Sequence, residues 1–98
     1  MGPLRRRLVH VRAQEILTEK HGLDAKKIKK AYKLLGGQDA ALSTVFATFG
    51  VTDDTAASPV AAIGDGKIID AILEWLKSDQ GQAVIAALVK LLLAALGM

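Results

Sequence analysis

The chain contains no cysteine and few aromatic residues, and each shortage excludes a class of protein. Without cysteine there is no disulfide framework, no thiolate zinc site, no iron–sulfur cluster and no cysteine nucleophile. Aromatic residues make up only 4% of the 98 residues, so the chain offers little for aromatic stacking. The sequence therefore points away from secreted, disulfide-bonded domains and from cysteine-dependent chemistry.

The longest apolar stretch is too short for a conventional membrane span. Residues 83–96 are apolar apart from Lys90, whereas a spanning helix needs roughly 20 apolar residues. A lysine near the middle of such a helix costs about 3 kcal/mol on insertion scales. The apolar stretch after the three arginines at positions 5–7 is also too short for a signal peptide. We therefore expect an intracellular or particle-associated protein.

Apolar residues are abundant and follow a helical pattern. They account for 51% of the chain, and the mean hydropathy is +0.29, which predicts a folded domain. They recur at helical spacing over residues 4–20, 25–35, 39–49, 66–77 and 80–96, and no segment favours a strand. The sequence predicts an all-α fold, a small bundle of four to five helices with the apolar C-terminal helix at or near the centre.

The predicted helices belong to a single helical domain over residues 1–98. Its basic three-helix part covers about residues 1–50, the longest loop covers 51–64, and a C-terminal helical hairpin covers 65–98. The apolar residues of the last helix cover roughly half of its circumference, which is more than one neighbouring helix needs. That helix is therefore either the centre of the bundle or also meets a second surface, such as another subunit or a lipid interface.

The net charge of +3 conceals a division along the chain. Residues 1–33 contain ten Lys and Arg against three acids, a net charge of +7, whereas residues 34–98 contain three Lys against seven acids, a net charge of −4. Such a split predicts two faces or ends that meet different partners. The candidate phosphate-contacting residues of the basic third are Arg5, Arg6, Arg7, Arg12, Lys26, Lys29, Lys30 and Lys33.

Nucleic acid bound by this basic third would be held weakly and non-specifically, with a strong dependence on salt, because phosphate binding needs charge and little else. A helix–turn–helix across Gly36 and Gly37 stays open. Its second helix offers hydroxyl groups such as those of Ser43 and Thr44 but no cation that would read bases.

Nothing in the sequence predicts a catalytic, cofactor-binding or metal-binding site. His10 and His21 lie about three helical turns apart, roughly 16 Å, so they cannot share one metal within a single chain. We interpret both as surface or cap residues. Glu15 and Glu19 lie on a basic helix, where pairing with a cation such as Arg12 explains them. We therefore expect no enzymatic activity, no cofactor and no small-molecule substrate.

The leading hypothesis is a non-enzymatic structural or assembly protein, such as a small component of a virion or another large particle. Its C-terminal hairpin would dock on a protein partner or on copies of itself, and its basic part would face an acidic partner. The candidate interface residues are Trp75, Ile85, Leu88, Val89, Leu92, Leu93 and Leu96. Two alternatives stay open, a non-specific nucleic-acid-binding module and a protein that binds a membrane interface through the last helix and Trp75.

Overall fold

The protein is an all-α bundle, as the sequence predicts. The computed structural model describes the backbone of residues 3–50 and 65–98, and the side chains of residues 6–50, 70 and 72–98. Within these ranges the chain forms the helices α1 (Pro3–His21), α2 (Ala25–Leu34), α3 (Gln38–Phe49), α5 (Asp65–Lys77) and α6 (Asp79–Ala95). The expected helices begin and end within one residue of the observed ones. The loop expected over residues 51–64 lies outside the described residues.

Local capping interactions explain where the helices begin and end. The Asp24 carboxylate accepts a hydrogen bond of 2.8 Å from the backbone N–H of Lys27, which caps the start of α2. Gly36 and Gly37 end this helix with positive φ angles of 91° and 109°. The backbone N–H of Gly37 donates to the Tyr32 carbonyl at 2.8 Å, the hydrogen bond of a Schellman motif. The chain thereby turns into α3 within three residues.

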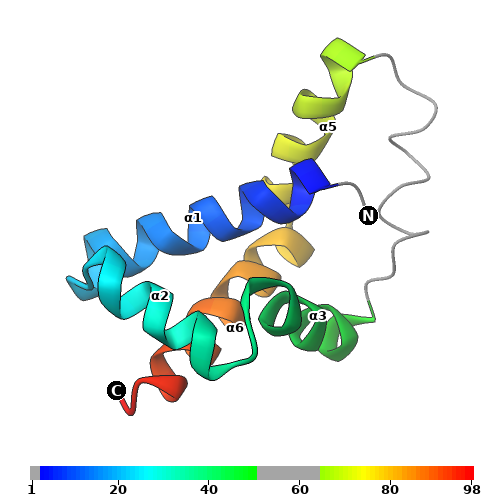
Figure 1. Cartoon of the computed structure of the whole chain (residues 1–98). Helices are drawn as coiled ribbons and strands as arrows, with labels where there is room; N and C mark the ends of the chain where they lie inside the picture. Colours follow the sequence, from blue (N-terminus) through cyan, green and yellow to red (C-terminus); the bar gives the residue numbers. More distant parts are fainter. Residues whose placement is uncertain (1–2, 51–64) are drawn as a thin grey trace.

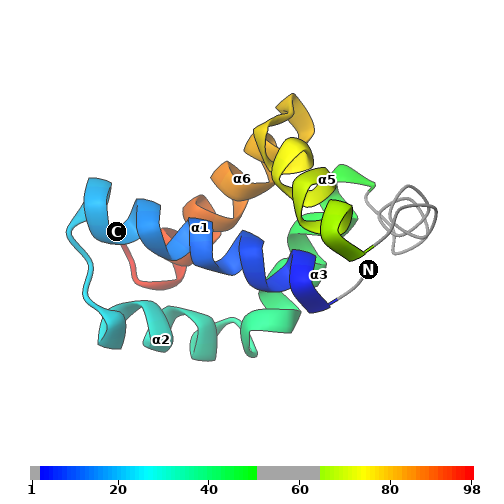
Figure 2. The same cartoon turned by 90° about the horizontal axis from the view of Figure 1, so that it is seen from above.

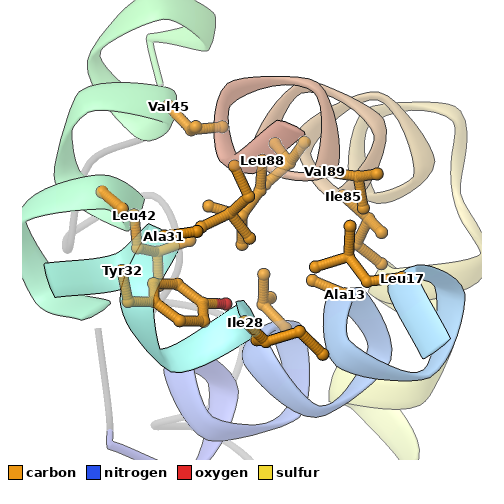
Figure 3. Packing of buried hydrophobic residues seen from close by; sticks show 14 of the residues in the cluster. Ala13, Leu17, Ile28, Ala31, Tyr32, Leu42, Val45, Ile85, Leu88 and Val89 are labelled. Carbon is orange, nitrogen blue, oxygen red and sulfur yellow. The ribbon is translucent and has the colours of Figure 1, made fainter. Parts of the chain in front are cut away.

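Helix α6 lies at the centre of the bundle. It packs against α1, α2, α3 and α5 (Figure 1), and the view from above shows α1 and α2 meeting at their shared turn (Figure 2). Figure 3 shows side chains of α1, α2 and α3 converging on Leu88 and Ile85 of α6, which are both at most 2% exposed. The expectation of a central C-terminal helix is confirmed. The C-terminal hairpin therefore shares one core with α1, α2 and α3.

Four of the residues expected to form a partner interface belong to this core. The exposed fractions of Ile85, Leu88, Val89 and Leu92 are 2%, 0%, 6% and 0%. The wide apolar arc of α6 packs inside the chain, because the surrounding helices cover it from several sides. These four side chains therefore lie in the core of the chain rather than on its surface.

Helix α1 is also packed on the core along most of its length. Val9, Ala13 and Leu17 recur at every fourth position and are fully buried, whereas Leu8 and Ile16 are partly buried beside them. The helix begins at Pro3, so its first turn is helical. Among the described helices, none is long and apolar enough to cross a membrane.

Candidate docking groove

A groove runs between α1 and α2. Its volume is about 970 Å³. Gln14 and Thr18 of α1 form one wall, and Lys29 and Lys33 of α2 form the other. The remaining lining residues lie at the base and the two ends of the groove: Leu23, Asp24, Ala25, Ile28, Tyr32, Gly36, Gly37 and Gln38. A side chain that enters this groove meets mostly carbon at the base and ammonium groups at one wall.

The sequence of α2 fixes which side of the helix contributes to the groove. Ile28, Ala31 and Tyr32 are buried and face the core. Lys29 and Lys33, one turn apart, therefore lie together beside the buried side and reach the groove. Their apolar stems and charged heads suit such a position, since lysine buries its methylene groups and keeps its ammonium in water.

A stripe of four exposed lysines continues outward from this wall. Lys26 and Lys30 are exposed and, at helical spacing, lie next to Lys29 and Lys33. Within the described residues, none of the four takes part in an ion pair. Lys27 is exposed as well, but it lies on the opposite flank of α2. The lysine stripe is therefore a strip of positive charge that no described acid neutralises.

A second hollow of about 390 Å³ adjoins the groove, because both are lined by Gln14 and Gln38. It is lined further by Arg6, Arg7, His10, Val11 and Asp39. The Arg6 guanidinium lies 3.7 Å from the Asp39 carboxylate, and the Asp39 side chain is 85% exposed. This ion pair connects the first turn of α3 to α1 beside the groove.

His10 lies under this second hollow and is buried, so the expectation of a surface or cap histidine is wrong for it. Only 6% of the residue is exposed. Its Nδ1 shares a hydrogen bond of 2.9 Å with the Tyr32 hydroxyl, and the two rings meet edge to face. Its Nε2 is buried and has no hydrogen-bond partner in the described part of the chain. His21, by contrast, is exposed at the end of α1.

Burial sets the protonation of both partners in this pair. Desolvation lowers the pKa of His10 below 6.5; the Asp39 carboxylate raises it again and the Arg6 guanidinium lowers it. Desolvation also raises the pKa of the Tyr32 hydroxyl to about 12. Both rings are therefore neutral at pH 7. Their hydrogen bond joins α1 to α2 at the base of the groove.

The structure gathers some of the expected cations and separates others. Arg6, Arg7, Lys29 and Lys33 line the two adjoining hollows, and Lys26 and Lys30 lie beside them. Arg12 lines neither hollow; it forms an ion pair of 2.9 Å with Glu15, as the sequence predicts. The side chain of Arg5 lies outside the described residues.

The remaining residues of the expected partner interface are only half-buried. Trp75 packs edge to face on Phe46 of α3, with ring centroids 6.5 Å apart. Leu93 and Leu96 pack against the core from its edge. Trp75 belongs to α5, whereas Leu93 and Leu96 lie one turn apart at the end of α6.

The groove itself was missed at the sequence level, because it depends on the angle between two helices. The apolar spacing of α2 was a usable signal for the lysine wall, but no pattern in α1 singled out Gln14 or Thr18.

The hydroxyls of Thr44 and Thr48 donate to backbone carbonyls of their own helix at 3.0 Å. This arrangement gives the second helix of a helix–turn–helix little to read bases with.

Within the described residues, no three side chains of the metal-ligating kinds gather into a group that could hold an ion. Comparison of the chain with protein-family models, with curated proteins and with solved structures finds no match.

Proposed function

We propose that this protein is a non-enzymatic assembly protein whose basic groove holds an acidic, amphipathic helix of a partner. The observation that carries the proposal is the groove between α1 and α2, with buried carbon at its base and Lys29 and Lys33 along one wall. An amphipathic helix lying in a groove is a common mode of peptide recognition. Such a helix presents apolar anchors to the base and acidic groups to the lysines.

Charge and shape both favour this kind of partner. Lys29 and Lys33, which form no ion pair with any described residue, steer an acidic segment toward the groove and set its register. The base, formed by Leu23, Ile28 and Tyr32, belongs to the rigid core, so the groove exists before binding. A pre-formed site avoids much of the ordering cost of association. The apolar arc of α6 does not compete for this role, since it is buried inside the chain.

Two synthetic peptides of about four helical turns test the proposal. One carries leucine and glutamate at helical spacing, and the other carries the same number of glutamates with alanine in place of leucine. We expect the leucine-containing peptide to bind more tightly in a fluorescence anisotropy titration, because only it places apolar groups on the base. Equal binding of the two peptides, or binding of neither, would overturn the proposal.

Charge reversal locates the binding site. Lys29→Glu with Lys33→Glu should weaken binding of the leucine-containing peptide about tenfold, the effect of turning two exposed attractive contacts into repulsive ones. Lys27→Glu, on the opposite flank of α2, is a single-site control outside the groove and should change the affinity little. A similar loss in both variants would show that net charge, rather than the groove, controls binding.

A second candidate function is non-specific binding to the phosphate backbone of nucleic acid. The observation that favours it is the stripe formed by Lys26, Lys29, Lys30 and Lys33, which is unpaired within the described residues. Lys26→Glu with Lys30→Glu separates the two functions, because these lysines lie outside the groove. In this variant a nucleic-acid duplex should lose affinity and the slope of log affinity against log salt should become shallower, whereas peptide binding should be largely retained.

A further inference from the structure

Helix α5 carries an exposed acidic stripe of the kind that the groove would accept. Asp70, Leu73 and Glu74 lie at i, i+3 and i+4, so they share one face of the helix, and all three are exposed. Leu73 is 41% exposed, so its apolar side chain is available to a partner; Leu34 of α2 is more exposed still, at 59%. Lys77 extends the same face at the end of the helix.

The position of α5 makes this stripe accessible. Its inner face packs through Ile72 and Leu76, which are 2% and 9% exposed, and its main neighbour is α6. In Figure 1 the beginning of α5 projects beyond the other helices. The acidic stripe and the groove thus occupy different parts of the molecule, so one copy can offer α5 while its own groove stays open.

The spacing of charges in the stripe matches the spacing in the groove wall. Asp70 and Glu74 are four residues apart, and so are Lys29 and Lys33. Four residues correspond to about 6 Å along a helix, so two such helices lying side by side bring both pairs of opposite charges into register. Leu73 lies between the two acids, where it would face the base of the groove.

Resting on the proposed function, we propose that the occupant of the groove is α5 of a second copy of this chain. Asp70 and Glu74 of one copy pair with Lys29 and Lys33 of the next, and Leu73 rests on the groove base. Because the two surfaces differ, the contact is head to tail, so it either extends into chains or closes into a ring, of which a pair of copies that exchange α5 reciprocally is the smallest. The contact is small and its charges are exposed, which makes the association weak and salt-sensitive.

A charge exchange between two variants tests this contact by sedimentation velocity at low salt. The groove variant is Lys29→Glu with Lys33→Glu, and the α5 variant is Asp70→Lys with Glu74→Lys. In either variant alone, the contact would bring like charges face to face. Each variant should therefore sediment as a monomer. In an equal mixture, the unaltered α5 of the first variant meets the unaltered groove of the second, and the two reversed surfaces match as well. The mixture should therefore associate again, at least as strongly as the wild-type chain.

Controls separate the outcomes. Lys27→Glu should self-associate like the wild-type chain, and helical circular dichroism should be the same for all variants, because every altered residue is exposed. A wild-type chain that stays monomeric, or a mixture that fails to associate, would overturn the α5 contact. If the leucine-containing peptide still binds the groove in that case, the proposed function stands with a different partner; if it does not, both fail.

Discussion

At the scale of single residues, the His10–Tyr32 pair is the most informative feature. It places one polar hydrogen bond inside an otherwise apolar core and leaves His10 Nε2 without a partner in the described part of the chain. A buried polar atom without a hydrogen bond costs about 1–3 kcal/mol. The pair therefore contributes little to the net free energy of unfolding. Its main effect is to fix how α1 packs on α2, beside the groove.

Removing one member of this pair should destabilise the protein more than removing both. Tyr32→Phe leaves both ring nitrogens of His10 buried without partners, so we expect a loss of about 1–3 kcal/mol in the free energy of unfolding. Adding His10→Phe removes the orphaned nitrogens and should recover part of that loss. Urea denaturation of the two variants measures this. A double variant less stable than Tyr32→Phe would show that the imidazole packs in a way that a phenyl ring cannot.

The same pair predicts how stability depends on pH. Burial holds the pKa of His10 below its unfolded value of 6.5, so the unfolded chain takes up a proton first as the pH falls. The contribution of His10 to the free energy of unfolding should therefore be full above pH 6.5. It should decline as the pH falls below 6.5 toward the pKa of His10 in the folded chain. Urea melts between pH 5 and 7 of the wild-type chain and of His10→Phe test this; an unchanged slope in the variant would exclude His10 as the cause.

At the scale of the helices, the tight corner between α5 and α6 fixes how the C-terminal hairpin folds. Gly81 is buried in the first turn of α6, and a Cβ built on it would lie 2.8 Å from Leu76 Cα and nearer still to the carbonyl oxygen of Trp75. These are backbone atoms, which cannot turn aside. The Ser78 hydroxyl accepts a hydrogen bond from the Gly81 N–H at 3.2 Å and caps the helix at the same place.

Gly81→Ala should therefore destabilise the protein although alanine favours helix formation. We expect a loss of about 1–3 kcal/mol from overpacking, partly offset by about 1 kcal/mol of helix propensity. Gln80→Ala, at an exposed position in the same turn, is the control and should stay within about 0.5 kcal/mol of the wild-type chain. Thermal unfolding followed by circular dichroism gives both values. A stabilised Gly81→Ala variant would mean that the two helices can separate without cost.

The helices were predictable because their signals are local. The spacing of Leu42, Val45 and Phe46 marks the buried face of α3, and Gly36 and Gly37 mark the end of α2 within a few residues of the hydrogen bonds involved. Burial of His10 was not predictable, since it depends on a tyrosine 22 residues further along the chain. Local spacing shows which residues share a helix face, but not which neighbour covers that face.

At the scale of the whole molecule, local spacing also left open what covers the apolar arc of α6. Its apolar arc fitted a central helix and a docking helix equally well, and only the packing of α1, α2, α3 and α5 around it shows that the chain covers it. The candidate lysines were predictable as a stripe on α2. The groove beside them was not, because its walls come from two helices whose relative position no residue pattern encodes.

We propose that this protein contacts other molecules through charged surfaces rather than through the apolar arc of α6. The most direct test is the mass of the wild-type protein in solution, measured by light scattering over a range of concentrations at low and at high salt. Charged contacts predict a mass that rises with concentration at low salt and returns to the 10.4 kDa monomer at high salt. An oligomer that persists unchanged at high salt, or a monomer under every condition, would contradict it.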